Sequence, residues 1–533
     1  MNMIGPRIKA RPLFHRRNAA CLLLLVFAMA LTLSAFAEVG LARDGRLPLG
    51  LPLYGGGLAL LALVAYAVQS KFAPYADPLL LPLAVALNGL GLAMIYRLDL
   101  DTSAQKQAAL STGEVAKDAA DAKTQLLWSF VGIALFVAAV LIMRDTGKSG
   151  ARLSFTPKTA QRYPYLIGFA AVIFLLLPIV PGIGTSINGA RVWIRVGAFS
   201  LQPGEFAKIM LVILFAGYLV NKRQAMSLIG KKIGPVSLPR ARDLGPIMVI
   251  WIFCLGVLFV QKDLGTALLY FGLFISMIYI ATQRASWVLI GVGLLAAGIV
   301  IATMLPFMSH VNQRIDIWKN PEPYFDGGCV VGGKVVPVNP DTELFKQEVA
   351  VSGRKLGAGL RACDKLGGKF ADSAQLMKGL FALGQGGVLG TGLGQGEPWR
   401  TPLAFSDFIF DSLGEEIGLT GLMALLLMYA LIVQRGMKTA IAARDPFLKL
   451  FAGGVSFILA LQVFLIVGGV TKLIPLTGLA TPFLAQGGSS LMANWILIAI
   501  LVRLSHDARK PAPKAIQEEG MTQVVSMRQA PGQ

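Results

Sequence analysis

Three acidic residues follow one another at a spacing of four where a polar loop runs into an apolar segment. They are Asp407, Asp411 and Glu415, and in a helix they form an acidic stripe on one face. The neighbours of Asp407 at positions 405, 408 and 410 are all phenylalanines. A carboxylate in such surroundings at a membrane boundary is costly unless something requires it. It either caps the helix or carries chemistry, and the residues alone leave both interpretations open.

Charged residues also stand at the start of two other apolar runs. Glu205 and Lys208 are spaced i, i+3, so they can form a structural ion pair at a helix start or serve a function there. They end the segment 188–208, which Trp193 and other apolar residues make amphiphilic, and which we expect at the outer membrane interface. Asp263 lies in a short turn between two apolar runs, where it either caps the next helix or takes part in chemistry.

Several well-known catalytic motifs are missing from the chain. Seven glycines fall between positions 384 and 396, but no strand precedes them, so they do not form a dinucleotide-binding fingerprint. The sequence contains no HExxH, CxxC, GxxxxGK[ST] or GxSxG, which leaves zinc-protease, P-loop and hydrolase-elbow interpretations without support. Three His and four Cys in the whole chain leave little room for a His/Cys metal centre.

The elements that must position these residues are membrane helices. Of 533 residues only 15% are charged and 55% are hydrophobic, whereas a soluble globular protein has about 25% charged residues. The net charge of +20 comes from 49 basic and 29 acidic residues. Because the basic residues lie between apolar runs, this charge reports membrane topology and predicts no nucleic-acid partner.

Twelve runs approach the roughly 20 apolar residues that a bilayer requires. With the N-terminus inside, 27 Lys and Arg fall on the cytoplasmic side and 22 outside, of which 11 lie in the long loop 309–410. Long loops cross largely regardless of charge, so both termini are predicted to be cytoplasmic. The first run has a second interpretation, as a cleaved signal peptide ending near Ala37. The runs are 19–41, 51–69, 77–96, 125–143, 163–182, 205–221, 245–261, 264–281, 286–308, 412–434, 447–470 and 488–502.

Ordered signatures along the chain resemble the SEDS family of membrane proteins (shape, elongation, division and sporulation; FtsW and RodA). The resemblance covers about 77–505 and implies a core of ten helices. We therefore expect an all-α polytopic membrane protein of about twelve transmembrane helices. It has two added helices within 1–76, the core 77–505 and a disordered cytoplasmic tail 506–533. The signatures are Asn188-Gly-Ala-Arg191 with Gln202-Pro-x-Glu-x-x-Lys208, Asp263-Leu-Gly-Thr266, Gly387 to Gly394, Ser406-Asp407-Phe-Ile-Phe410, Gly414-Glu-Glu-x-Gly418, Pro475-x-Thr-Gly478 and Gly487-Gly-Ser-Ser490.

The resemblance implies a peptidoglycan glycosyltransferase, active in cell division or in cell-shape maintenance. Such an enzyme polymerises lipid II at the outer face of the bacterial cytoplasmic membrane, among membrane lipids and with a class B penicillin-binding protein as transpeptidase partner. The family's essential aspartate falls on Asp407. In this role its carboxylate takes the proton of the attacking sugar hydroxyl, a contribution of roughly 10²–10⁴-fold. A lipid II flippase and a non-catalytic scaffold that recruits the transpeptidase are the alternative functions.

The leaving pyrophosphate needs cationic or metal partners. The resemblance makes no organic cofactor necessary, but Asp407 with Asp411 or Glu415 is a candidate site for Mg²⁺ or Mn²⁺. Arg191 and Arg314 are the first candidates for the pyrophosphate because arginine binds phosphate in bidentate fashion. The full set of substrate-binding candidates is Arg191, Arg195, Lys208, Lys262, Arg314, Gln375 and Lys472. Supporting roles are expected for Trp193, Glu205, Asp263, Glu415, Glu416, Ser489 and Ser490.

The chain departs from the family pattern around its aspartate. Many members carry Glu, His and Thr where this chain has Leu403, Phe405 and Ser406, so a mechanism that needs that Glu or His is in doubt. The loop from Asn320 also exceeds the usual length. It contains Cys329 and Cys363, which either form a disulfide outside the membrane or remain two free thiols.

Overall fold

The computed structural model describes most of the chain, and its helices match the predicted membrane runs. In the described residues, nine helices are long and apolar enough to cross a membrane. They are α1 (Pro12–Asp44), α2 (Gly57–Phe72, preceded by a π-helical turn Pro52–Gly56), α3 (Leu80–Leu110), α4 (Ala122–Ile142), α7 (Gly204–Ser227), α9 (Leu264–Thr282), α15 (Ile409–Ala442), α16 (Pro446–Val470) and α17 (Gly488–Arg509). The described residues are 12–110, 121–144, 157–187, 190–197, 199–227, 232–233, 236–237, 241–304, 309–325, 328–331, 334–337, 363, 369–371 and 373–511.

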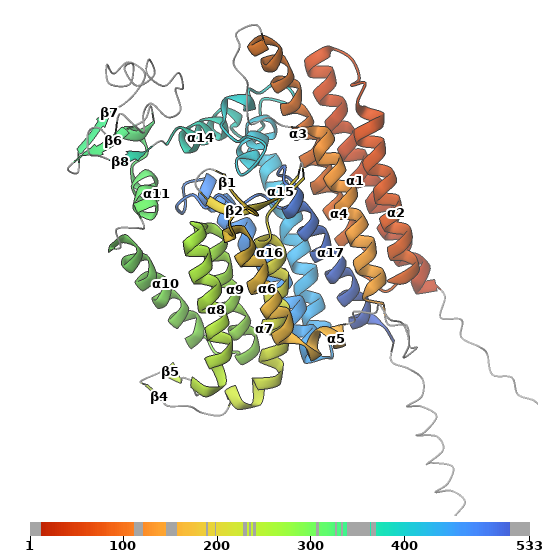
Figure 1. Ribbon diagram of the computed structural model, residues 1–533. Coiled ribbons are helices and arrows are strands. Elements are labelled where there is room, and N and C mark those ends of the chain that lie inside the picture. Colours follow the sequence, from red (N-terminus) through yellow and green to blue (C-terminus); the bar gives the residue numbers. More distant parts are fainter. Residues whose placement is uncertain are drawn as a thin grey trace, which may run out of the picture.

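Three further apolar helices occupy the remaining three predicted positions. They are α6 (Pro164–Leu176), α8 (Ala241–Gln261) and α10 (Ser286–Met304). The helices run side by side in one bundle (Figure 1). Most of α3 and α17 is buried, whereas α1, α2 and α4 leave much of their apolar surface uncovered. That pattern fits a core surrounded by helices whose outer faces meet lipid, so the chain is a polytopic α-helical membrane protein.

Smaller elements join the helices at the two ends of the bundle (Figure 1). Strands β1 (Gly184–Ile187), β2 (Ala190–Val196) and β3 (Phe199–Leu201) form one antiparallel sheet, and β7 (Lys334–Pro337), β6 (Gly328–Val331) and β8 (Lys369–Ala371) form another. Helices α11 (Ser309–Lys319) and α14 (Ala374–Gly386) lie at the same end as these sheets. Helix α5 (Pro157–Arg162) and the hairpin β4 (Lys232–Ile233) and β5 (Val236–Ser237) lie at the opposite end.

The segment 188–208, which the sequence placed at the membrane interface, contains the strands β2 and β3 and ends in the first turn of α7. In β2 the residues Arg191, Trp193 and Arg195 alternate with valine and isoleucine, and alternation with a period of two favours a strand over a helix. The residues 188–189 and 198 of this segment lie outside the described residues.

The glycine-rich segment 384–396 forms backbone hydrogen bonds with α15 where that helix is interrupted. Gly418 has a non-helical conformation within this helix (φ 65°, ψ −175°). The N–H groups of Leu419 and Thr420 then donate to the carbonyls of Gly387 and Val388 (2.9 and 3.1 Å). A Cβ on Gly390 would lie 2.3 Å from a carbonyl oxygen of α15. The glycines therefore allow a backbone-to-backbone contact that side chains would prevent.

The predicted disulfide is formed between Cys329 of β6 and Cys363. Beside it, the Ser373 hydroxyl donates to the Pro321 carbonyl (2.7 Å), and the Ser373 N–H donates to the Tyr324 carbonyl (3.1 Å). These contacts tie the start of α14 to the end of α11, although a long stretch of chain separates the two helices. The two hydrogen bonds of Ser373 therefore fix the position of α14 relative to α11.

Candidate active site

Asp407 lies in the turn that leads into α15, with only 8% of its surface exposed. The predicted acidic stripe is shorter than expected, because α15 begins at Ile409 and leaves Asp407 outside the helix. Phe408 occupies the N-cap position, and no side chain caps this helix end. The helix-cap interpretation of Asp407 therefore receives no support from the geometry.

Burial raises the pKa of the Asp407 carboxyl from 3.8 to about 6. The Arg314 guanidinium and the backbone N–H groups of Asp407 and Phe408 oppose this rise, because they stabilise the charged form. The Gln375 amide lies 3.5 Å from Asp407 Oδ1, where it can donate a weak hydrogen bond. The carboxyl is thus mostly ionised at pH 7, yet it binds a proton far more readily than an exposed aspartate.

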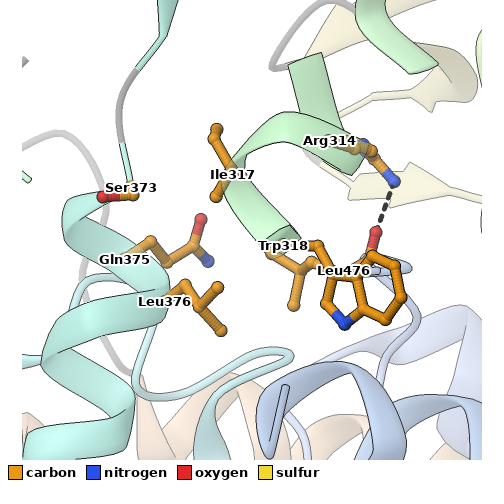
Figure 2. Close-up of a pocket in the computed structure, with 7 residues that line it drawn as sticks. All are labelled: Arg314, Ile317, Trp318, Ser373, Gln375, Leu376 and Leu476. Atoms are coloured by element: carbon orange, nitrogen blue, oxygen red, sulfur yellow. Dashed lines mark hydrogen bonds between the residues drawn. The ribbon is translucent and has the colours of Figure 1, made fainter. Parts of the chain in front are cut away.

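Two sequence-predicted residues, Arg314 and Gln375, meet beside Asp407. Arg314 comes from α11 and Gln375 from the first turn of α14, and both line a small cavity of about 60 Å³. Figure 2 shows the two helices facing each other across this cavity, with Arg314 bonded to the Leu476 carbonyl at 2.9 Å. The other lining residues are Ile317, Trp318, Ser373, Leu376 and Leu476.

Arg314 also connects Asp407 with Asp263. Burial raises the pKa of the Asp263 carboxyl, as it does that of Asp407, and the Arg314 cation opposes both rises, while burial lowers the pKa of Arg314 itself. Asp263 accepts a hydrogen bond from the Thr266 N–H (3.0 Å), so it is the N-cap of α9, as one interpretation of the sequence predicted. One carboxylate therefore caps α9 and also feels the charge of Arg314.

Lys472 lies next to this group but takes part through its backbone. The Trp318 indole N–H donates to the Lys472 carbonyl (3.1 Å), and Lys472 adopts a left-handed conformation with φ 63°. Its half-buried side chain stays a candidate for substrate contact. The bond fixes α11 against the loop between α16 and α17.

Arg191 and Lys262 line a second, larger cavity of about 260 Å³. Both side chains are exposed, so their cations are open to an anionic group. Arg195, also on β2, is exposed but does not line this cavity. The structure thus places Arg314 near Asp407, with Lys472 beside it, and places Arg191 and Lys262 together at a second cavity.

Lys208 is held inside the bundle. It is only 1% exposed, and its Nζ donates to Glu205 Oε2 (2.6 Å) and to Gln462 Oε1 (2.9 Å). These contacts support the structural ion pair and leave the ammonium without open space for a pyrophosphate. Ser489 accepts a hydrogen bond from the Gln202 N–H at 2.7 Å, so the supporting role expected of this serine is compatible with its position.

The remaining predicted residues bind neighbouring backbone and side chains. Glu415 Oε1 accepts from the Glu397 N–H (2.6 Å), and Glu416 Oε2 accepts from the Gly394 N–H (3.0 Å). Ser490 accepts from the Asn494 amide within α17 (3.2 Å). Trp193 is half-buried in β2, opposite Thr185 of β1. These residues shape the elements around the site.

Asp411, one turn into α15, differs from its acidic neighbours. It is fully buried, and neither of its carboxyl oxygens has a hydrogen-bond partner among the described residues. A Cβ on Gly379 of α14 would lie 2.4 Å from Asp411 Oδ2, so the carboxyl fits against that glycine. Two unsatisfied buried oxygens near Asp407 are a feature that requires a proton or a cation.

Sequence reasoning missed Trp318 and Ser373, because no local signal marks a residue that lines a cavity between two distant helices. It also missed Arg97 and Asp101 of α3, which form a buried ion pair. A signal for this pair exists, since charged residues at i, i+4 at the end of an apolar run are expected to bind each other.

Fold and site together define an integral membrane protein, with the candidate residues around Asp407 at one end of a helical bundle. The family model of the FtsW, RodA and SpoVE cell cycle proteins matches residues 78–330 and 363–510. The chain belongs to this family. The match begins after α2 and omits 331–362, the stretch that the disulfide closes.

Relatives of the chain include the peptidoglycan glycosyltransferase RodA of Mycobacterium tuberculosis (strain ATCC 25618 / H37Rv). It is 41% identical over 501 residues, which cover 94% of this chain and 92% of the relative, so the alignment reaches into the first 76 residues. The probable peptidoglycan glycosyltransferase FtsW of Geobacter metallireducens is 29% identical and covers 80% of this chain and 94% of its own.

A solved structure supports the fold. A chain from the work described as "Structural coordination of polymerization and crosslinking by a peptidoglycan synthase complex" aligns with a TM-score of 0.50 at 22% identity. The alignment covers 82% of this chain and 99% of the other.

Proposed function

We propose that the chain is a peptidoglycan glycosyltransferase that polymerises lipid II into glycan strands. The observation that carries the proposal is Asp407, a buried carboxyl whose pKa is raised to about 6 and which has an amide and a guanidinium beside it. The names of the relatives support the same activity. A general base works best when its pKa lies near the operating pH, and this carboxyl meets that condition.

In the proposed reaction, the 4-hydroxyl of an acceptor sugar attacks the anomeric carbon of a lipid-linked donor. Asp407 takes the proton of this hydroxyl as the new bond forms. Gln375 and Arg314 hold the ionised carboxylate in place, since both can stabilise its charge. The bond to the pyrophosphate breaks in the same step, and the undecaprenyl pyrophosphate leaves.

The leaving pyrophosphate gathers negative charge and requires fixed cations. Arg191 and Lys262 are suited to this task because they are exposed and line one cavity. Arg314 is less suited than its residue type alone predicted, because its NH1 group is bonded to the carbonyls of Leu476 and Thr477. We assign Arg314 to the carboxylate and the other two cations to the pyrophosphate.

A divalent cation is the cofactor proposed for this site. No cluster of three metal-ligating side chains occurs in the described part of the chain, but the unsatisfied oxygens of Asp411 fit a cation shared with Asp407. Glu415 is less suited, because its Oε1 already accepts a backbone hydrogen bond. When bound, Mg²⁺ or Mn²⁺ would supply charge neutralisation at the pyrophosphate, whose oxygens prefer hard cations.

The proposed orientation places both termini in the cytoplasm and the end of the bundle that carries Asp407 at the outer face, where lipid II is used. A class B penicillin-binding protein is the proposed partner. The neighbouring structure of a peptidoglycan synthase complex is compatible with such a partner.

The test is polymerisation of purified lipid II by the full-length protein with its partner transpeptidase. We expect glycan polymer from the wild type and none above background from Asp407→Ala. Asp316→Ala is the matched control, because Asp316 is an exposed aspartate of α11 in the same long loop. A normally active Asp407→Ala variant would refute the assignment of the base.

If the folded wild type makes no polymer, transport or scaffolding becomes the better hypothesis. A flippase would move fluorescent lipid II across a vesicle membrane without polymerising it. A scaffold would bind the transpeptidase equally well with and without the Asp407 carboxyl.

A further inference from the structure

Three buried charges and one exposed arginine connect the first helix with the core of the protein. Arg97 of α3 is fully buried and donates to Glu416 Oε1 of α15 (3.0 Å), to the Gly396 carbonyl (2.8 Å) and to the Asp101 carboxylate. Arg43, near the end of α1, forms an ion pair with the same Asp101 carboxylate. We call these four charged residues the Arg97 cluster.

Among the four residues of the Arg97 cluster, the charges balance only when α1 supplies Arg43, and the buried carboxyl of Glu415 lies close enough to act electrostatically on Arg97 as well. Arg97 and Arg43 supply two cations, and Asp101 and Glu416 supply two anions. Asp101 and Glu416 are 5% and 1% exposed, whereas the Arg43 side chain is 38% exposed. Without Arg43, two buried carboxylates would share a single cation, and an uncompensated buried charge is strongly unfavourable.

Helix α1 also contacts the glycine-rich segment directly. A Cβ on Gly394 would lie 2.8 Å from the Cβ of Ala42 and 3.3 Å from the Cα of Val39. Gly394 has φ +87°, a conformation that favours glycine. Its N–H donates to Glu416 Oε2 (3.0 Å). The glycine segment is therefore held between α1 on one side and α15 on the other.

The elements joined by the cluster also carry the candidate active site. Glu416 lies about two turns into α15, the helix that Asp407 immediately precedes. A Cβ on Gly386 of α14 would lie 2.1 Å from the Gly414 carbonyl, so α14 packs directly on the same part of α15. Helix α14 also carries Gln375, so the helix whose amide contacts Asp407 packs on the helix to which the Arg97 cluster is bonded.

We infer that α1 is a positioning element for the active site, and that Arg43 is a positioning residue. It completes the Arg97 cluster and thereby orders residues 387–397 against the start of α15. Helices α1 and α2 lie outside the match to the family model, so this device is an addition to the family core. The predicted effect of Arg43 on catalysis rests on the proposed function. The predicted ordering of residues 387–397 does not depend on that function.

The first experiment measures hydrogen exchange of the full-length protein in detergent, in peptides that cover 387–397. Arg43→Ala is expected to speed exchange there by about tenfold, the equivalent of one lost net interaction of a charged group. Arg43→Lys should stay close to wild type, since it keeps the charge. Arg46→Ala is the matched control, because Arg46 is an exposed arginine three residues further along.

The second experiment measures lipid II polymerisation by the same variants. Arg43→Ala is expected to lower kcat by about tenfold, within the roughly 10²-fold that a misplacement of about 1 Å can cause, with KM little changed. Adding Asp101→Asn to Arg43→Ala restores the charge balance. We therefore expect the double variant to polymerise lipid II faster than it would if the rate losses of the two single variants simply multiplied.

The inference would be supported by three results together. Hydrogen exchange at 387–397 is faster in Arg43→Ala, it is unchanged in Arg46→Ala, and the polymerisation rates of the Arg43→Ala and Asp101→Asn variants are not additive. Unchanged exchange at 387–397 in Arg43→Ala would overturn it, whatever the activity. Faster exchange with an unchanged kcat would overturn the positioning role in catalysis. A folded wild type without polymerase activity would instead refute the proposed function, and the exchange data would still decide whether Arg43 orders the segment.

Discussion

Asp407→Asn should abolish activity and at the same time stabilise the protein. The asparagine keeps the size of the side chain and can still accept hydrogen bonds, but it cannot act as a base near neutral pH. We expect polymerisation to fall by roughly 10²–10⁴-fold, the usual contribution of a general base. The wild-type rate should depend on the ionised carboxyl, which has a pKa of about 6.

The pH dependence follows from this pKa. Between pH 7 and pH 5 the ionised fraction of a group with a pKa of about 6 falls about tenfold, and we expect the rate to fall with it. A carboxyl with the ordinary pKa of 3.8 would stay almost fully ionised over the same range. A flat profile would therefore contradict the assignment.

The effect on stability has a definite sign. The pKa of Asp407 is raised on folding, from 3.8 to about 6, so ionisation above pH 6 destabilises the folded state. The shift corresponds to about 3 kcal/mol at neutral pH. Asp407→Asn removes this cost and should raise the free energy of unfolding by up to that amount at pH 7. The gain should shrink as the pH falls through 6 and vanish below about 4.

The assay combines gel analysis of lipid II polymer with thermal unfolding of the same samples at pH 4, 5, 6, 7 and 8. Asp316→Asn serves as the control, because it removes an exposed carboxyl of α11. An active Asp407→Asn variant would show that this carboxyl is not the base. An inactive variant that is less stable than wild type at pH 7 would show that the loss of activity reflects damage to the fold.

Three further perturbations follow from the same structure. Arg314→Gln removes a cation that favours the ionised Asp407, so the midpoint of the pH–rate profile should move above about 6; an unmoved midpoint would exclude this coupling. Replacing Cys329 and Cys363 by serine removes a cross-link between positions 34 residues apart. It should lower the free energy of unfolding by about 2–4 kcal/mol, with reduced wild type as the comparison. Lys208→Met leaves the buried Glu205 carboxylate without its cation and should lower the free energy of unfolding by about 3–5 kcal/mol. Adding Glu205→Gln should restore most of this stability. A double variant as unstable as Lys208→Met alone would contradict the ion-pair role.

The membrane helices could be predicted because each is encoded within its own run of residues. A segment that crosses a bilayer must be apolar over about 20 residues and must satisfy its own backbone hydrogen bonds. The cap at Asp263 and the pair of Glu205 with Lys208 are equally local, because each joins residues within one helical turn. Local rules did not find the strand β2, whose alternating residues also satisfied the pattern of an interfacial segment.

The sequence by itself determined the membrane-spanning elements, and its resemblance to the family selected Asp407, whereas the structure decided that Cys329 and Cys363 are bonded. The tertiary structure decided which distant residues serve that aspartate and which are engaged elsewhere. Gln462, 254 residues from Lys208, holds this lysine inside the bundle, and Glu416, 319 residues from Arg97, joins α15 to α3 through a buried ion pair. Such pairings depend on how finished helices pack against one another, and no property of either residue's neighbours in the chain fixes that packing.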